Sequence, residues 1–364
     1  MTQKQRRQLQ TLILSWFETN KRDLPWRQNY SPYEVWISEI MGQQTQMERV
    51  VDFFERWMRA FPDLEALGRA PEQKVLKCWE GLGYYSRARN IRKCAEIIVK
   101  DHHGQLPADR DTLIRLPGIG PYTAAAISSI AFERDEPLVD GNIARLFTRY
   151  FNIDSWLREP ATVKLLWKKA AQLLPKGRAR DFNQALMELG ALICTPKKPL
   201  CPDCPWSSTC KALAHGLVSK RPATRPGQKI ITIEMATGIL QHRNRFFIQQ
   251  RLADDVWGSL WEFPGGRLKK DESPADGVVR EFSEETGFLI RVDNKITTTT
   301  HHYTRYKVIL HCYSCRFSES PSSPLLTAAQ DFRWVSCREL DNYAFPAGHR
   351  KLIDHLREQA LYNC

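Results

Sequence analysis

Four cysteines close to one another constrain this chain more than any other feature. They are Cys194, Cys201, Cys204 and Cys210, spaced as C-x6-C-x2-C-x5-C. Four thiolates brought together in this way can hold one metal centre. Structural zinc usually takes two separated C-x2-C pairs, or cysteine with histidine. The spacing therefore favours a [4Fe–4S] cluster, with zinc or unligated thiols as the alternatives. Residues 196–199, Pro-Lys-Lys-Pro, make the loop basic and suited to phosphate.

Positive charge is spread unevenly along the chain. The 364 residues include 53 basic and 41 acidic side chains, a formal net charge of +12. Residues 1–220 hold 33 basic and 24 acidic side chains, so a net +9 lies there. We therefore expect a polyanionic partner for this part of the chain.

The sequence also lacks the usual signals for membranes and secretion. It has no run of about 18 apolar residues that would span a bilayer. The N-terminal residues MTQKQRRQLQ lack the apolar core of a signal peptide. We therefore expect a cytoplasmic protein without a membrane partner, and we expect a monomer.

The chain has two regions with different sequence patterns. Residues 1–217 repeat apolar side chains at intervals of three and four, as helices do. Residues 218–229, VSKRPATRPGQK, are rich in proline, glycine and charge and predict a linker. Residues 230–364 carry short β-branched and aromatic runs, with helices near Pro274–Thr286 and His349–Gln359. The chain is thus predicted to be multidomain, an all-α region followed by an α/β domain.

A glycine-rich turn suggests a phosphate contact in the helical region. Residues 113–127, LIRLPGIGPYTAAAI, predict two helices joined at Pro117, Gly118 and Gly120. Glycines let a backbone approach a phosphate, and the N–H groups that begin the next helix can bind it. An ordinary turn between helices is the alternative. Asp140 follows in residues 138–145, LVDGNIAR, where it could equally be a helix N-cap.

A second acid stands in an apolar setting. Glu39 lies in residues 35–46, VWISEIMGQQTQ. Desolvation there would raise the pKa of the carboxyl group and keep a proton available near neutral pH. A surface glutamate on an amphipathic helix is the alternative.

Taken together, these motifs resemble adenine DNA glycosylases of the MutY family. They are residues 39–46 (EIMGQQTQ), 81–90 (GLGYYSRARN), 116–120 (LPGIG), 139–142 (VDGN) and the four cysteines, in that order. The resemblance implies a helix–hairpin–helix fold with an iron–sulfur loop at 194–210. It also implies a nucleoid-associated enzyme of bacterial type that removes adenine mispaired with 8-oxoguanine, or with guanine, in duplex DNA.

The resemblance assigns four residues to the chemistry. Glu39 would protonate adenine at N7 and later assist water, as a general acid and base. Asp140 would stabilise or trap the cationic sugar, and Asn142 would orient the water or Asp140. Tyr122 stands where related bifunctional enzymes place a lysine, so we expect a monofunctional enzyme. An AP lyase of the endonuclease III type and a non-catalytic DNA-binding protein are the competing classes.

The resemblance also implies contacts with DNA around an extruded base. Gln44 matches a residue that fills the gap in the duplex, and Tyr84 matches one that packs on the lesion strand. The full set of expected contacts in this region is Gln43, Gln44, Tyr84, Arg87, Pro117, Gly118 and Gly120. The family usually has leucine where this chain has Gly42. Because Gly42 lacks the apolar side chain of that leucine, we expect the discrimination between mispairs to differ more from the family's than catalysis does.

The second domain carries a complete Nudix box, G-x5-E-x7-R-E-U-x-E-E-x-G-U, that begins at Gly266. Glu281, Glu284 and Glu285 fall on one face of a helix. Three carboxylates so placed repel one another unless a hard cation such as Mg²⁺ lies between them. The domain resembles the Nudix-like domain with which this family reads 8-oxoguanine. A second interpretation adds hydrolysis of an oxidised nucleoside triphosphate, and an ordinary charged helix is the alternative to both.

The lesion-reading loop departs from the family pattern. The family often has Phe-Ser-His after a threonine-rich strand, and this chain has Tyr303, Thr304 and Arg305. Thr304 retains a hydroxyl group and Tyr303 retains an aromatic ring, whereas Arg305 could pair with a phosphate. We therefore expect these three residues to contact the lesion strand.

Overall fold

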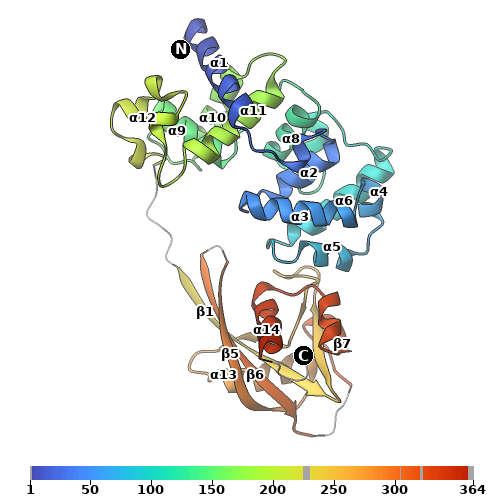
Figure 1. Ribbon diagram of the computed structural model, residues 1–364. Helices are drawn as coiled ribbons and strands as arrows, with labels where there is room; N and C mark the ends of the chain where they lie inside the picture. Colours follow the sequence, from blue (N-terminus) through green and yellow to red (C-terminus); the bar gives the residue numbers. More distant parts are fainter. Residues whose placement is uncertain (1, 224–229, 304, 320–322, 360–364) are drawn as a thin grey trace. The chain divides into compact units, whose positions relative to one another are not determined.

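The computed structural model describes residues 2–223, 230–303, 305–319 and 323–359. The chain forms two compact units. The first comprises residues 1–69 and 90–227, and the second comprises residues 70–89 and 228–364. Figure 1 shows helices throughout the first unit and a sheet with helices in the second. None of the described helices is long and apolar enough to cross a membrane.

The first unit is built from helices. Its α-helices are α1 (Gln3–Asn20), α2 (Pro32–Met41), α3 (Met47–Ala60), α4 (Leu64–Gly68), α6 (Ser86–Asp101), α7 (Arg110–Ile114), α8 (Pro121–Ala126), α9 (Gly141–Phe151), α10 (Pro160–Leu173), α11 (Ala179–Glu188) and α12 (Lys211–Ala214). Its 3-10 helices are η1 (Pro25–Arg27), η4 (Cys201–Asp203), η5 (Ser207–Thr209) and η6 (Val218–Lys220), and its π-helices are η2 (Ile127–Ala131) and η3 (Leu189–Ile193). The first four residues of α6 belong to the second unit.

One apolar core joins α1, α9, α11 and the cysteine loop. Leu9 and Ile13 of α1 are buried at helical spacing against this core. Trp206, which lies between two of the cysteines, is buried and donates its indole N–H to the carbonyl of Leu9 at 3.0 Å. The cysteine loop is thereby attached to the first helix of the chain.

The predicted hairpin is present. Helix α7 ends at Ile114 and α8 begins at Pro121, with proline at its first position. Gly118 has a φ of +77°, and a Cβ there would lie 2.7 Å from the Cβ of Asn90. A side chain at Gly118 is therefore excluded both by backbone conformation and by the approach of α6.

The second unit contains one mixed sheet. Its strands are β1 (Ile231–His242), β2 (Arg245–Arg251), β3 (Trp261–Glu262), β4 (Gly265–Arg267), β5 (Ile290–Tyr303), β6 (Tyr306–Phe317) and β7 (Ala329–Val335). The order is β3-β2-β1-β6-β5, with β4 on β1 and β7 on β2. Strands β1 and β6 run parallel, and β5 pairs with β6 in the antiparallel sense. The helical elements of the unit are α5 (Glu72–Trp79), α13 (Pro274–Thr286), η7 (Arg338–Asn342) and α14 (Ala347–Glu358).

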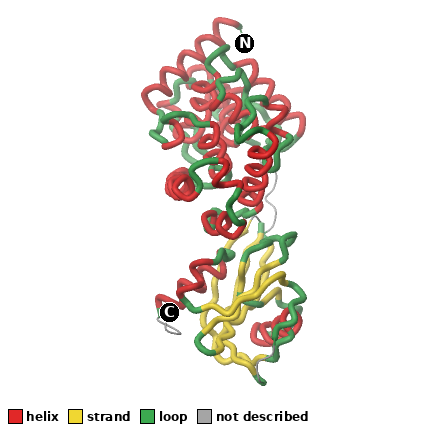
Figure 2. The backbone as a smooth tube through the Cα atoms, turned by 90° about the vertical axis from the view of Figure 1, so that its right-hand side faces the viewer, coloured by secondary structure: helices red, strands yellow, loops and turns green. Residues whose placement is uncertain are grey.

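Helices cover both faces of this sheet, as Figure 2 shows. Phe246 and Ile248 of β2 pack in one cluster with α14, whereas Phe247 between them packs in a second cluster with α13. This alternation is expected of a strand with both faces buried. The all-α and α/β fold classes predicted for the two regions are confirmed.

The compact units differ from the expected domain boundaries at two places. Residues 70–89, which contain α5, group with the sheet rather than with the helices around them in the sequence. Part of the expected linker, residues 218–223, is described with the first unit, and residues 224–229 lie outside the described residues.

Candidate active site

A cavity of about 740 Å³ opens in the helical unit. Its walls come from α2, the loop after it, α8, the start of α9 and the end of α11. Among its lining residues are Glu39, Gln43, Gln44, Tyr122, Asp140, Asn142, Arg145, Gln184 and Glu188. All four residues expected to carry the chemistry therefore face one space, although they come from three separate helices.

Glu39 lies near the end of α2, where its neighbours Ser38 and Ile40 are buried. The hydroxyl of Tyr122 donates a hydrogen bond to its carboxylate. Burial raises the pKa of Glu39 to about 7, and the nearby charge of Asp140 raises it as well. The hydrogen bond from Tyr122 and the charge of Arg27 act in the opposite direction. Glu39 can therefore carry a proton near neutral pH and give it up to a bound base.

Asp140 is the N-cap of α9. One of its oxygens accepts the N–H of Ile143 at 2.7 Å, and the other accepts the amide of Asn142 at 2.8 Å. Burial raises the pKa of Asp140, and these two hydrogen bonds lower it. The capping role and the catalytic role are compatible, because the carboxylate that fixes the helix start also faces the cavity.

Arg145 extends this arrangement toward the cysteines. Its guanidinium donates to the carbonyl of Asn142's side chain at 3.0 Å, to Gly190 O at 2.6 Å and to Cys194 O at 2.8 Å. Gly190 is required for this fit, since a Cβ there would lie 2.7 Å from the Cβ of Asn142. One cation thus joins the amide that holds Asp140 to the backbone of the first cysteine.

The four cysteines surround a small apolar cavity of about 30 Å³. All four are free thiols. Arg149 is buried beside them and donates to Cys194 Sγ at 3.4 Å and to Thr195 O at 2.7 Å. Within the described ranges, no three His, Cys, Asp or Glu side chains are gathered closely enough to hold a single metal ion. Four cysteine side chains line one cavity with a cation beside them, an arrangement suited to an anionic metal–thiolate group.

A polar cluster that the sequence did not predict lies on the cavity wall. Glu188 is 1% exposed and accepts hydrogen bonds from Arg22 at 2.9 Å and from Arg27 at 2.7 Å. Gln184 accepts from Arg27 at 2.9 Å. Arg22 and Arg27 are more than 150 positions from their partners in the sequence. The one sequence signal for these contacts was Glu188, a charged residue at the end of the largely buried helix α11.

The expected DNA contacts lie in several parts of the structure. Gln43 and Gln44 line the cavity, and Gln44 has a φ of +58°. Pro117, Gly118 and Gly120 form the turn of the hairpin. Tyr84 and Arg87 are in the second unit, and Arg87 lies over the rings of Trp79 and Tyr84. Thr304 and the side chain of Tyr303 lie outside the described residues, whereas Arg305 is exposed.

The carboxylates of the Nudix box take different partners. Arg280 contacts Glu281 and Glu284, each at 2.8 Å, and pairs with Glu272 through two nitrogens at 2.6 and 2.8 Å. Glu285 instead turns into the fold and accepts from Gln249 at 2.9 Å. Burial raises the pKa of Glu285 to about 8.

A close approach explains the glycine that begins the box. A Cβ at Gly266 would lie 2.3 Å from an oxygen of Glu281. The box is therefore assembled as its spacing predicts, but protein cations and amides already satisfy its acids.

Comparisons with known proteins identify a family for each part of the chain. The family model for HhH-GPD superfamily base excision DNA repair proteins matches residues 37–172, and that for NUDIX domains matches residues 235–355. A solved thermostable thymine-DNA glycosylase is 32% identical, with a TM-score of 0.54 over 58% of this chain and 98% of that one. A solved endonuclease III–DNA complex, 23% identical with a TM-score of 0.52, shares the fold over 60% of this chain and 99% of that one.

Curated relatives match more of the chain than these solved structures do. The adenine DNA glycosylase of Rattus norvegicus is 42% identical, covering 97% of this chain and 78% of the relative. That of Homo sapiens is 31% identical, covering 97% and 74%. That of Buchnera aphidicola subsp. Baizongia pistaciae is 38% identical, covering 69% and 72%. This chain therefore belongs to the adenine DNA glycosylase family.

Proposed function

We propose that this chain removes adenine mispaired with 8-oxoguanine, or with guanine, in duplex DNA. The observation that carries the proposal is that Glu39 and Asp140 face the same cavity. A base must leave the helical stack to reach such a space. The positive charge of the chain, a net +12, supports a polyanionic substrate.

The two acids have complementary tasks in this reaction. Protonated Glu39 donates to adenine N7, which makes the base a better leaving group. Asp140 then stabilises the positive charge that develops on the deoxyribose, or traps it covalently. Asn142 and the backbone of Ile143 donate to the two oxygens of Asp140 and favour its anionic form, against the rise in pKa that burial causes. Burial raises the pKa of both acids, but Asp140 accepts two hydrogen bonds that favour its anion and Glu39 accepts one, and on this difference we assign Glu39 as the acid and Asp140 as the anion.

One wall of the cavity is polar. It is formed by the ion-paired side chains of Arg22, Arg27 and Glu188. Glu188 can accept a hydrogen bond from an exocyclic amine, and the two arginines pair with its carboxylate. A base that carries a carbonyl in place of that amine would meet a second acceptor. The pocket therefore favours adenine over hypoxanthine.

We further propose that Cys194, Cys201, Cys204 and Cys210 hold one [4Fe–4S] cluster. Such a group fixes the loop that carries it and supplies no step of the hydrolysis. The Nudix-like domain is proposed to read 8-oxoguanine through residues 303–305. Magnesium binding and nucleotide hydrolysis by the Nudix box, a monomeric state and a cytoplasmic location stay predictions.

The decisive experiment measures adenine release from duplexes with adenine opposite 8-oxoguanine, guanine or cytosine. We expect release from the first two and little from the third. Release from none of them would contradict the proposal. Borohydride trapping tests the monofunctional mechanism, because Tyr122 cannot form the Schiff base that a lysine would form. An efficient protein–DNA crosslink would overturn that part.

A further inference from the structure

Residues 70–89 occupy an unexpected place. They lie inside the stretch that matches the glycosylase superfamily, residues 37–172, yet they pack as part of the second unit. Helix α5 presents Val75, Leu76 and Trp79, all fully buried. A piece of glycosylase sequence is therefore a component of the Nudix-like unit.

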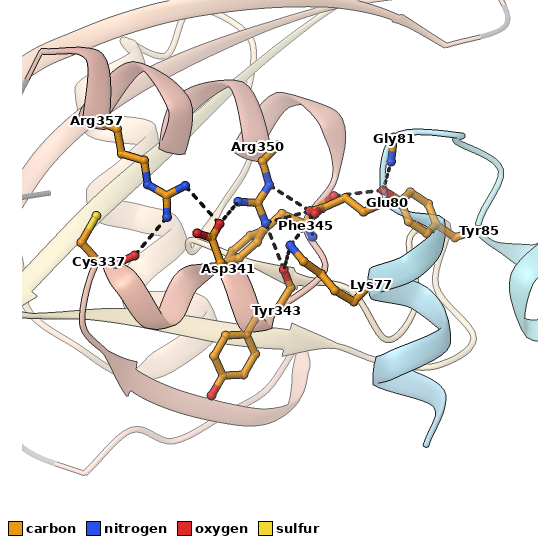
Figure 3. A network of polar contacts seen from close by, with 10 residues as sticks. All are labelled: Lys77, Glu80, Gly81, Tyr85, Cys337, Asp341, Tyr343, Phe345, Arg350 and Arg357. Carbon is orange, nitrogen blue, oxygen red and sulfur yellow. Dashed lines mark hydrogen bonds and ion pairs between the residues drawn. The ribbon is translucent and has the colours of Figure 1, made fainter. Parts of the chain in front are cut away.

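Glu80 is the centre of the attachment, as Figure 3 shows. One of its oxygens accepts the backbone N–H of Phe345 at 2.8 Å and two nitrogens of Arg350 at 3.0 and 2.9 Å. The other accepts Lys77 at 2.6 Å. The side chain of Glu80 is 12% exposed, and that of Arg350 is 18% exposed. Water therefore screens this pair less than it screens a surface ion pair.

Other contacts hold both sides of the same segment. The hydroxyl of Tyr85 donates to Phe345 O at 3.1 Å, and Lys77 donates to Tyr343 O at 3.1 Å (Figure 3). Gln73, before α5, donates to Ser259 O at 2.8 Å and accepts the indole N–H of Trp261 at 2.9 Å. Arg89, at the far end, donates to Gly258 O.

Between Glu80 and Tyr85 the chain makes a tight loop. Gly81 and Gly83 have φ angles of +101° and +71°. Tyr84 has a φ of +48°, a backbone conformation that residues other than glycine rarely adopt. Arg87 donates to Leu82 O at 3.0 Å and to Gly83 O at 3.2 Å. A conformation of this kind persists only where its surroundings hold it. Glu80 and Tyr85 fix the two ends of the loop through their contacts with Phe345 and Arg350.

We infer that Glu80 is a positioning residue for Tyr84, and that the Nudix-like unit acts on lesion recognition through Arg350 and Glu80. The inference rests on the proposed function, in which Tyr84 packs on the strand that holds 8-oxoguanine. Removing Glu80 leaves Arg350 and Lys77 half-buried without their shared acid, and it frees one end of the loop. Tyr84 would then lose its fixed direction, while Glu39 and Asp140 keep theirs.

The test compares Glu80→Ala with Glu80→Gln, which keeps an oxygen for Phe345 N–H and Arg350. Glu65→Ala is the control, because Glu65 makes an exposed pair with Arg69. Each full-length variant is assayed for affinity and single-turnover release on duplexes with adenine opposite 8-oxoguanine or guanine. We expect Glu80→Ala to weaken binding of the 8-oxoguanine duplex about tenfold, a size typical of coupled neighbours. Glu80→Gln should recover most of that loss.

A double-mutant cycle separates positioning from general destabilisation. In a Tyr84→Ala background, Glu80→Ala should cause no further loss of preference for 8-oxoguanine. Additive losses in that cycle, or a Glu80→Ala variant that matches Glu65→Ala, would overturn the inference.

Amide hydrogen exchange over residues 80–89 gives a readout that does not depend on activity. Faster exchange in both Glu80→Ala and Arg350→Ala is expected, and unchanged exchange would overturn the inference. If the native chain released no adenine but the exchange result held, the proposed function would fail and the positioning of this loop would stand.

Discussion

The phenol of Tyr122 donates its hydrogen bond to the carboxylate of Glu39 inside the cavity that Asp140 also lines. The bond favours the charged form of Glu39, so it lowers a pKa that burial has raised. Tyr122 therefore adjusts how much of the general acid is protonated at a given pH.

This relationship predicts the pH profile of the enzyme. Release of adenine should fall as pH rises above about 7, where Glu39 loses its proton. Tyr122→Phe removes the hydrogen bond, raises the pKa of Glu39 further and moves the falling limb to higher pH. Single-turnover rates between pH 5 and 10 measure the shift. Tyr33→Phe, whose hydroxyl bonds Phe61 O elsewhere in the unit, should leave the limb in place.

Glu39 also predicts a dependence of stability on pH. Its folded pKa is raised from 4.5 to about 7. The stability linked to this group is therefore complete below pH 4.5 and is lost as pH rises through 7. Glu39→Gln avoids that loss, so its advantage over the native chain should grow to at most about 3 kcal/mol between these limits. Denaturant unfolding at pH 5 and pH 8 measures it. Glu65→Gln should show no such growth.

Asp140 can be tested for its two roles separately. Asp140→Asn keeps an N-cap acceptor and loses the charge, so stability should hardly change while adenine release falls about a hundredfold or more. Asp140→Ala should also cost about 1 kcal/mol of stability. Asp63→Ala, which removes the cap of α4, is the matched control for the capping loss alone. Normal release by Asp140→Asn would contradict the assigned role.

The cysteine loop predicts iron content. Cys204→Ser should lower iron and sulfide per chain well below the native level, whereas Cys78→Ser outside the loop should not. Arg149→Met removes donors to Cys194 and Thr195 and should speed the loss of iron to a chelator. Elemental analysis and visible absorption measure both effects. Zinc in place of iron in the native chain would overturn the cluster assignment.

Arg280 predicts how the Nudix box responds to magnesium. Its guanidinium forms ion pairs with the carboxylates of Glu281 and Glu284, so a metal ion that binds these carboxylates must displace the guanidinium. Arg280→Met should therefore make the melting temperature rise more on addition of Mg²⁺ than it does for the native chain. Arg316→Met, which breaks an ion pair with Asp293 at the edge of the sheet, serves as the control. Equal responses would show that Arg280 does not compete with the metal.

Local patterns predicted the elements that depend on neighbouring residues. Helix α13 has the predicted bounds, Pro274–Thr286, because Ser273 caps its start and Gly287 ends it in a left-handed conformation. The hairpin turn also lies where its proline and glycines indicate. The approach of Glu39 and Asp140 followed from the family resemblance alone, because periodicity does not say which helices meet.

Contacts between distant parts of the chain could not be predicted in this way. Glu188 pairs with Arg22 and Arg27, and Glu80 pairs with Arg350, across separations that no sequence period spans. The apolar side of α5 indicated only that it would be buried, and the partner depends on the folded chain. Arg280 pairs with Glu281 and Glu284, two of the three carboxylates for which the spacing predicts a metal, and magnesium binding there stays a prediction.

The backbone passes between the two units more than once, so one cut in the chain need not separate them. The chain leaves the first unit after Arg69, returns at Asn90 and leaves again before Ile230. A protease that cut only the stretch ahead of Ile230 would make two polypeptides, and the N-terminal one would still carry α5 and Glu80. Under native conditions the fragments should co-migrate, held by packing and ion pairs instead of a peptide bond.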